Sequence, residues 1–292
     1  MQIAECKIQN AMVVFERILE MQRWSETERR QGRRIALVPT MGALHEGHLS
    51  LVRDAKGRGD RVVVSLFVNP TQFAPGEDFA SYPRDFERDR KLLEAEDVDV
   101  LFHPAVQEMY PEGFDAGIEI RELSAPLCGA LRPGHFRGVT TVVAKLFNIV
   151  RPHVAIFGCK DYQQLQIIRR LVRDFNFDIE IIGHPTVREA DGLAMSSRNA
   201  YLNPAERRAV ICLYRSLRFA EQLVGRGERR ATVIVAGARG EIARETLARI
   251  EYVNLCDPET LREIDLMQDA ALLALAVRIG KARLIDNIIL TP

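Results

Sequence analysis

Short apolar runs alternate with longer amphipathic segments along the first two thirds of the chain. Patterns typical of buried strands cover residues 35–38, 62–68, 98–102, 154–157 and 179–182; each is short and bounded by polar residues, Gly or Pro. Helical patterns cover about 48–58, 83–96, 139–150 and 161–175. Because strands that alternate with helices build βαβ units, the pattern predicts an α/β fold with a mainly parallel sheet.

The pattern changes after about residue 186. A polar stretch punctuated by Gly and Pro, TVREADGLAMSSRNAYLNP, precedes two helical patterns at 204–224 and 232–249, with Pro204 at a first-turn position. Strand-like runs follow at 250–255, 272–278 and 282–290. A chain of 292 residues exceeds what one hydrophobic core usually serves, so we expect two domains, the second a smaller α+β unit.

Composition narrows the class of protein. With 47% hydrophobic and 27% charged residues the chain has the composition of an ordinary globule, and 40 basic residues balance 40 acidic ones. This zero net charge argues against nucleic acid as a partner. The longest apolar run, 270–277, has eight residues, and a membrane-spanning helix needs about 20. The first ten residues lack the basic and apolar segments of a secretory signal.

The cysteines indicate a reducing compartment. Cys6, Cys128, Cys159, Cys212 and Cys256 are odd in number, lie far apart and form no CxxC pair. We therefore expect free thiols in a cytoplasmic protein, without a disulfide framework or a structural zinc site.

The segment VPTMGALHEGH follows an early predicted strand and opens a helix. His45 and His48 are three positions apart, so helical geometry places both on one side of the helix start. Free N–H groups and the positive dipole end favour an anion there, and Gly42 and Gly47 let a bulky ligand approach the backbone. The arrangement suits nucleotide phosphates and the charge that develops during nucleotidyl transfer.

Other interpretations of this segment stay open. The two histidines could simply cap the helix or pack against it. Zinc binding is a poorer explanation, because HEGH lacks the HExxH spacing and no third ligand is evident. A P-loop is excluded, since GxxxxGK[ST] is absent. HxGH is also the form of the HIGH motif of nucleotidylyltransferases and class I aminoacyl-tRNA synthetases.

The segment LAMSSRN in the polar stretch carries complementary groups. The hydroxyls of Ser196 and Ser197 and the guanidinium of Arg198 can bind triphosphate oxygens. Ser-Ser-Arg occurs in many exposed loops, so alone it is weak. It resembles the KMSKS loop that accompanies HIGH, and the pair is a far more specific signal than either segment.

Two further segments follow predicted strands. In FGCKDYQQL, Lys160 can reach phosphates, while Asp161 can accept from ribose hydroxyls or only cap the next helix. In FVNPTQF, the amide of Gln72 suits the orientation of a small polar acid; the alternative is a turn residue after Asn-Pro.

Five segments in order, PTMGALHEGH, FVNPTQF, RPGHFRGV, GCKDYQQL and ADGLAMSSRN, closely resemble the pantothenate synthetase (pantoate–β-alanine ligase) family of the HIGH-motif nucleotidylyltransferase superfamily. The resemblance implies a Rossmann-like sheet with helices on both faces in residues 1–186, which binds nucleotide and pantoate. It implies that residues 187–292 form a smaller lid domain carrying the KMSKS-like loop, and that the protein is a homodimer. The implied reaction condenses pantoate with β-alanine through a pantoyl adenylate, consuming ATP with Mg²⁺ and releasing AMP and pyrophosphate.

The resemblance also implies residue roles. The residues implied to act in catalysis are His48, His45, Lys160, Ser196 and Ser197. Those implied to line ATP are Met41, Gly42, Ala43, Leu44, His45, Glu46, Gly47, His48, Gly158, Cys159, Lys160, Asp161, Val187, Met195, Ser196, Ser197 and Arg198. Those implied to bind pantoate or β-alanine are Gln72, Gln164, Tyr82 and Arg132, and Asp89 is the implied magnesium ligand.

Two positions depart from the family pattern. Asp89 stands beside Arg88, where related chains carry another acid, which weakens its magnesium assignment. Cys159 replaces the glutamate of the usual Gly-Glu-Lys-Asp, and a thiol cannot supply that charge. Because the proposed chemistry passes through a free adenylate, it needs no cysteine nucleophile.

Rival functions are distinguishable by assay. One is another nucleotidyltransferase that adenylates a phosphate ester, and another is a non-catalytic nucleotide-binding protein that has kept the fold. A class I tRNA synthetase is disfavoured, because the chain is short and neutral and lacks an evident anticodon-binding domain.

Overall fold

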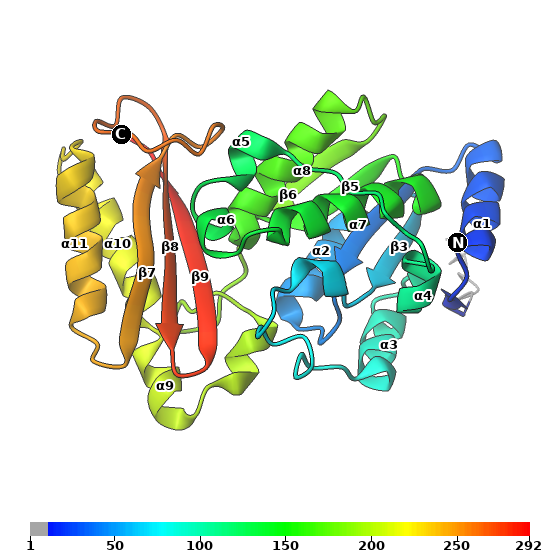
Figure 1. Cartoon of the computed structure of the whole chain (residues 1–292), viewed down its shortest axis with the longest axis horizontal. Helices are drawn as coiled ribbons and strands as arrows, with labels where there is room; N and C mark the ends of the chain where they lie inside the picture. Colours follow the sequence, from blue (N-terminus) through cyan, green and yellow to red (C-terminus); the bar gives the residue numbers. More distant parts are fainter. Residues whose placement is uncertain (1–10) are drawn as a thin grey trace, which may run out of the picture.

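The computed structural model describes residues 11–292; Cys6 and the N-terminal stretch assessed for a signal lie outside the described residues. Two sheets organise this part of the chain, one of six strands and one of three (Figure 1). Within it, every helix is too short or too polar to cross a lipid bilayer.

The six-stranded sheet is parallel throughout, in the order β1-β4-β3-β2-β5-β6. Its strands are β1 (Val13–Phe15), β2 (Ile35–Thr40), β3 (Arg61–Leu66), β4 (Val100–Phe102), β5 (Val154–Gly158) and β6 (Glu180–His184). The predicted parallel α/β architecture is confirmed. Strand β1 escaped prediction because it has three residues and lies at an edge of the sheet, where its side chains are largely exposed.

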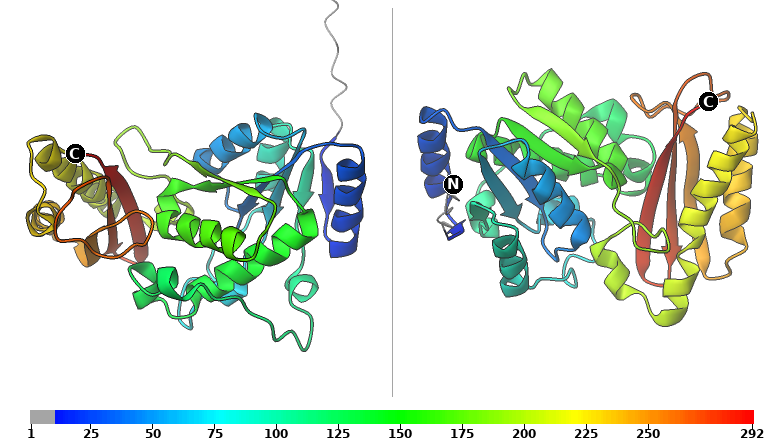
Figure 2. Two further views of the ribbon diagram at one scale, coloured as in Figure 1. Left: turned by 90° about the horizontal axis from the view of Figure 1, so that it is seen from above. Right: turned by 180° about the vertical axis from the view of Figure 1, so that it is seen from behind.

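Alternating side chains divide β2 between two cores. Ile35 and Leu37 belong to one buried cluster, and Ala36 and Val38 to the other, as the two-residue period of a strand requires. The first cluster lies under α1 (Ile18–Arg30), α7 (His135–Val150) and α8 (Tyr162–Asp174), and the second under α2 (Glu46–Lys56) and α3 (Phe86–Ala95). Helices therefore cover both faces of the sheet (Figure 2).

Helix α1 was not predicted, for a physical reason. Its fully buried positions are Met21, Ser25 and Glu28, and Ile18 and Trp24 pack partly buried against the same core. Polar side chains therefore interrupt its inward stripe and weaken the apolar periodicity. Three short helices in the β4–α7 connection were also missed; these are α4 (Val106–Met109), α5 (Arg121–Ser124) and α6 (Cys128–Leu131).

The C-terminal part is a three-stranded antiparallel sheet with helices on one side. Its elements are α9 (Pro204–Ala209), α10 (Cys212–Gly225), α11 (Ala231–Ala243), β7 (Ala248–Cys256), β8 (Ala271–Ile279) and β9 (Ala282–Leu290). Leu273 and Leu275 of β8 pack with α10 and α11, whereas Leu272 and Ala274 pack on the opposite face, in the core that also contains Ile35 and Leu37 of the parallel sheet. The small sheet is thus buried on both faces and joins the two halves of the molecule.

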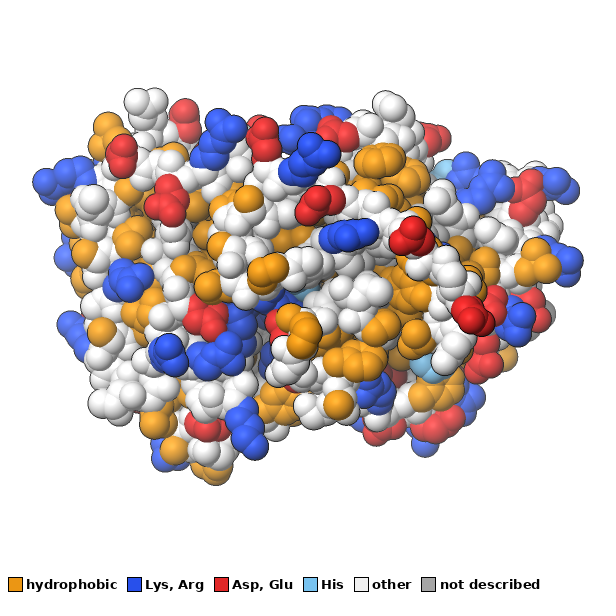
Figure 3. All heavy atoms as spheres, viewed as in Figure 1, with side chains coloured by type: hydrophobic (Ala, Val, Ile, Leu, Met, Phe, Trp, Pro, Cys, Tyr) orange, Lys and Arg blue, Asp and Glu red, His pale blue; other side chains and the backbone are white. Residues whose placement is uncertain are grey.

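Two helix predictions in this part were wrong in their extent. The expected helix 204–224 is two helices, interrupted where the Leu213 N–H bonds to the Val210 carbonyl in a tighter turn. The expected helix 232–249 ends at Ala243, and residues from Ala248 pair with β8 instead. On the face that Figure 3 shows, acidic and basic side chains are interspersed, in keeping with the balanced charge.

Strand β2 lies between β3 and β5, so the chain builds outward to one side of β2 and then to the other. At such a switch point the connections leave the sheet in opposite directions and open a crevice outside the carboxyl ends of the strands. The candidate site occupies this place.

Candidate active site

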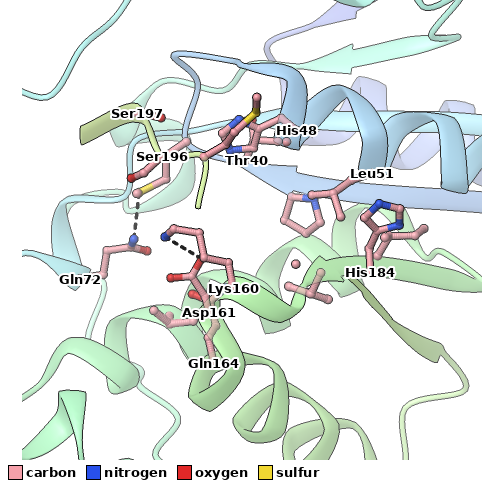
Figure 4. A pocket seen from close by; sticks show the side chains of 18 of the residues that line it. Thr40, His48, Leu51, Gln72, Lys160, Asp161, Gln164, His184, Ser196 and Ser197 are labelled. Atoms are coloured by element: carbon pink, nitrogen blue, oxygen red, sulfur yellow. Dashed lines mark hydrogen bonds and ion pairs between the residues drawn. The ribbon is translucent and has the colours of Figure 1, made fainter. Parts of the chain in front are cut away.

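A pocket of about 240 Å³ opens at the carboxyl ends of β2 and β5. Side chains of His48 and Leu51 enter it from α2, opposite Lys160, Asp161 and Gln164 (Figure 4). Sixteen of the residues singled out from the sequence line its wall: Met41, His45, Gly47, His48, Gln72, Tyr82, Arg132, Gly158, Lys160, Asp161, Gln164, Val187, Met195, Ser196, Ser197 and Arg198. The structure therefore brings the distant HxGH and Ser-Ser-Arg segments to one cavity.

The other expected nucleotide contacts lie around this wall. Leu44 is buried in the core beneath α2, and Glu46 is exposed and pairs with Arg53. Gly42 lines a neighbouring cavity, and Ala43 bonds to a second loop through its carbonyl. The sulfur of Cys159 is directed toward Gly183 on β6.

Helix α2 begins with the two histidines in contact. His45 is the N-cap residue, and its ring centroid lies 4.1 Å from that of His48. A Cβ at Gly47 would lie 2.9 Å from the His45 ring, so glycine makes room for it. The His45 N–H donates to Nδ1 of His48 at 3.4 Å, which leaves the proton of a neutral His48 on Nε2 as a donor for a ligand.

Both imidazoles are neutral at pH 7. Burial lowers the pKa of His48 to about 3, helped by His45 and Lys160, and burial lowers the pKa of His45 to about 4, helped by Lys160. Each ring can then donate one hydrogen bond without carrying charge. Lys160, which lies 3.7 Å from a carboxylate oxygen of Asp161, adds a positive charge beside them.

The Ser-Ser-Arg loop is bound to the HxGH turn. Ser197 begins η3 (Ser197–Tyr201), and its hydroxyl donates to the Ala43 carbonyl at 3.2 Å. The Ser196 hydroxyl accepts from the Arg198 N–H. Arg198 itself donates to both carboxylate oxygens of Asp78, each at 2.9 Å. The hydrogen bond between Ser197 and Ala43 thus fixes the position of one loop against the other. The guanidinium of Arg198 is held by Asp78, which the sequence analysis did not identify.

Gln72 ends η1 (Pro70–Gln72), a turn capped by the side chain of Asn69. Its amide is buried and fixed, because Nε2 donates to the Met41 sulfur at 2.8 Å and Oε1 accepts from Asn69 at 3.1 Å. A Cβ at Gly138 would lie 2.3 Å from the Thr71 carbonyl oxygen, so a glycine there lets α7 approach this turn. Asn-Pro forms the turn, and Gln72 nevertheless faces the pocket.

His135 was not singled out, although it stands in the quoted segment RPGHFRGV. Its Nδ1 donates to the Gln72 carbonyl at 2.7 Å and its Nε2 accepts from Arg132 at 3.1 Å. Burial, aided by Arg132, lowers the pKa of His135 to about 4. Arg132 in turn binds both oxygens of Glu77, at 2.6 and 2.5 Å.

The Lys160 turn, η2 (Cys159–Asp161), is supported from the small sheet. Asn287 on β9 donates from its amide to the carbonyls of Cys159, at 3.0 Å, and Lys160, at 2.8 Å. Its neighbour Asp286 binds Arg188 through both carboxylate oxygens. Sequence reasoning missed these contacts, since they join residues far apart in the chain.

His184 is a further wall residue that the motifs did not reveal. It ends β6, and its Nδ1 lies 2.9 Å from a carboxylate oxygen of Asp54 on α2. Its place at the carboxyl end of a predicted parallel strand, where ligands of such sheets bind, was a sequence signal that could have identified it as a site residue.

The residues present do not make a magnesium site by themselves. Both carboxylate oxygens of Asp89 accept backbone N–H groups, from Ala43 at 2.7 Å and Leu44 at 2.8 Å. Within residues 11–292, the structure contains no group of three or more His, Cys, Asp or Glu side chains arranged to hold a metal ion. Mg²⁺ in nucleotide enzymes is usually held by substrate phosphates with one or two carboxylates.

A parallel sheet with HxGH in the turn after β2, closed by a Ser-Ser-Arg loop, defines an enzyme of the HIGH-motif nucleotidylyltransferase type. The family model described as pantoate-beta-alanine ligase matches residues 13–289. The chain therefore belongs to the pantoate–β-alanine ligase family.

Individual relatives agree along almost the whole chain. The pantothenate synthetase of Thermotoga neapolitana is 56% identical over 279 residues, which cover 96% of this chain and all of the relative. The crystal structure of pantothenate synthetase from Thermus thermophilus is 45% identical with a TM-score of 0.92, covering 96% of this chain and 100% of that one. The pantoate–β-alanine ligase of Francisella tularensis, complexed with beta-gamma ATP and β-alanine, is 36% identical with a TM-score of 0.80, covering 96% and 98%.

Proposed function

We propose that this enzyme condenses pantoate with β-alanine at the expense of ATP, through a pantoyl adenylate, and releases AMP and pyrophosphate. The observation that carries the proposal is the convergence of the His45–His48 pair, Lys160 and the Ser196–Ser197 loop on one pocket that also contains Gln72. The Francisella tularensis relative, complexed with beta-gamma ATP and β-alanine, supports this choice of ligands.

In the first step a pantoate carboxylate oxygen attacks the α-phosphorus of ATP. An O–P bond forms, the bond to the leaving oxygen breaks and pyrophosphate departs. Negative charge grows on the phosphorus oxygens and the leaving group, where His45, His48, Lys160 and the Ser196 hydroxyl would donate hydrogen bonds. The Ser197 hydroxyl has one proton, which the Ala43 carbonyl holds, and it would join them by leaving that acceptor. These donors are held by the fold before reaction, so they cost little reorganisation in the transition state. ATP would enter as its Mg²⁺ complex, with the ion carried by the phosphates.

In the second step the uncharged amine of β-alanine attacks the adenylate carbonyl. A C–N bond forms, the C–O bond to AMP breaks, and the amine loses a proton. Gln72 and Gln164 would orient the pantoyl group, with Tyr82 and Arg132 nearby. The loop from Met195 to Arg198 would cover the adenylate and exclude water, which otherwise hydrolyses it.

Organisation and location form the remaining part of the proposal. We propose a nucleotide- and pantoate-binding domain at 1–186 and a lid domain at 187–292, working as a cytoplasmic homodimer. Free thiols at Cys128, Cys159, Cys212 and Cys256 support a reducing compartment. Light scattering of the purified protein tests the dimer.

Pyrophosphate release tests the reaction. We expect release to depend on pantoate within a panel of hydroxy acids, and AMP release to depend further on β-alanine. Pyrophosphate release with a phosphate ester in place of pantoate would favour another nucleotidyltransferase, and ATP binding without turnover would favour a non-catalytic protein.

A further inference from the structure

The turn that carries the histidines has an unusual backbone. Ala43 has a φ of 51°, in the left-handed region that residues other than glycine rarely adopt. Its N–H and that of Leu44 point away from the pocket and donate to the two oxygens of Asp89, at 2.7 and 2.8 Å. Such a conformation persists only where the surroundings hold it.

The carboxylate that holds this turn is deeply buried. The side chain of Asp89, on α3, is 1% exposed, and Arg88 beside it lies 3.4 Å away. Burial of a carboxylate is costly, and the two backbone N–H donors offset only part of that cost, since burial outweighs them and raises the pKa of Asp89. Because both oxygens are occupied by the turn, Asp89 acts on the pocket through the backbone of residues 43 and 44.

The carbonyl of Ala43 continues the connection. It accepts from the hydroxyl of Ser197 at 3.2 Å, so one peptide segment links Asp89 behind the turn to the serine loop across the pocket. We propose that Asp89 is a positioning residue: it fixes the turn from Ala43 to His45 so that the histidine pair and the Ser196–Ser197 loop face the same ligand. This inference rests on the proposed function, because its consequence is a loss of adenylation.

The variant Asp89→Asn tests the inference. An asparagine of the same shape offers one acceptor oxygen, and its amide N–H₂ meets the second backbone N–H. The turn then relaxes and the imidazoles lose their alignment with the developing charge. We expect kcat for pantoate-dependent pyrophosphate release to fall by roughly 30-fold or more, whereas the Kd for ATP, measured by calorimetry, rises by less than about 5-fold.

Asp99→Asn is the matched control. Asp99 accepts the Val62 backbone N–H at 2.8 Å, at the opposite end of β3 from the pocket. We expect both variants to lower Tm, and only Asp89→Asn to lower kcat. Equal rates in the two variants would make Asp89 a structural residue only and would overturn the inference.

Two further measurements complete the test. If Asp89 is instead a metal ligand, Asp89→Asn will move the Mg²⁺ concentration for half-maximal rate by about tenfold or more at fixed ATP, and the inference is then wrong. Should the variant not fold, amide hydrogen exchange of the wild-type protein tests the two hydrogen bonds to Asp89. We expect the amides of Ala43 and Leu44 to be protected, and fast exchange at both would refute the inference. A wild-type enzyme without pantoate-dependent pyrophosphate release would refute the proposed function. The exchange result would still test whether Asp89 holds the backbone of residues 43 and 44.

Discussion

Arg198 and Asp78 form a two-bond ion pair across 120 positions of sequence, with Nε and Nη2 each 2.9 Å from a carboxylate oxygen. Desolvation would by itself lower the pKa of Arg198, but the bonds to Asp78 and its negative charge raise it above the usual value. The guanidinium expected at the triphosphate is therefore held by an acid from the loop before α3. We infer that this pair anchors the Ser196–Ser197 loop over the pocket.

Asp78→Asn should loosen that loop. A charged hydrogen-bonded pair contributes about 1.5–3 kcal/mol to the free energy of folding. A substrate phosphate that binds the released Arg198 would offset part of this loss. We expect the KM for ATP to rise about 5- to 20-fold with a smaller change in kcat. Steady-state kinetics at saturating pantoate and β-alanine measures both. A lower KM would mean that Asp78 competes with ATP for Arg198.

His48→Ala should remove one preorganised donor and leave the fold intact. Loss of such a donor lowers kcat by roughly 10²- to 10³-fold, or about 2.7–4 kcal/mol. His153→Ala is a suitable control, since His153 accepts the Ile35 N–H at 2.9 Å, at the opposite end of β2 from the pocket. Near-wild-type pantothenate formation by purified His48→Ala would contradict the assigned role.

Gln72→Ala should impair the use of pantoate more than the binding of ATP. Its amide is fixed between Asn69 and the Met41 sulfur, so truncation removes an oriented polar group from the pocket wall. We expect calorimetry to show weakened pantoate binding with the ATP Kd changed less than about 2-fold. Equal losses for both ligands would place pantoate elsewhere.

The histidines should make stability depend on pH in the acid range. The pKa values of His45 and His135 fall from 6.5 to about 4, and that of His48 to about 3. Between pH 6.5 and 4 the unfolded chain therefore binds more protons than the native one. The free energy of unfolding must then decrease as the pH falls through this window.

Urea unfolding of His135→Asn isolates one contribution. Asparagine keeps a donor for the Gln72 carbonyl but cannot titrate. We expect the loss of stability between pH 7 and 4 to be smaller in this variant by about 2 kcal/mol, after allowance for partial exposure. An unchanged slope would mean that His135 takes up a proton in the native state at its ordinary pKa.

Cys159→Ser should keep its activity within about 2-fold, as expected of a substitution outside the reacting groups. The thiol is directed toward Gly183, and burial raises its pKa, which disfavours the nucleophilic thiolate. Its carbonyl, held by Asn287, is unaffected by the change. Pantothenate formation and the absence of a mass shift after reaction with ATP and pantoate provide the check.

Local patterns predicted the elements that bury apolar side chains. Strands β2, β3 and β5 are continuous apolar runs, and α8 has a clear apolar stripe, so each was located from sequence. Helix α1 was missed because Ser25 and Glu28 interrupt the apolar stripe that Ile18, Met21 and Trp24 form on its inward face. Local periodicity gives a weak signal for a helix that buries polar side chains among apolar ones.

The candidate site divides in the same way. Its ligand-facing groups lie in short motifs at strand ends and were found from sequence, as His48 and Lys160 illustrate. The groups that hold them, such as Asp78 and Asn287, are paired with partners over 100 positions away, and only the folded topology determines those pairs. The low pKa values of the histidines likewise arise from burial, which a linear motif does not encode.

Asn287 has a consequence for the order of events during synthesis. The turn around Lys160 gains its side support from a residue 127 positions further along the chain, on the last strand. A nascent chain that has already exposed every motif outside the ribosome must wait for β9 before this turn is secured. Termination of synthesis before residue 287 should therefore yield a product that carries the complete set of reacting groups and yet works poorly.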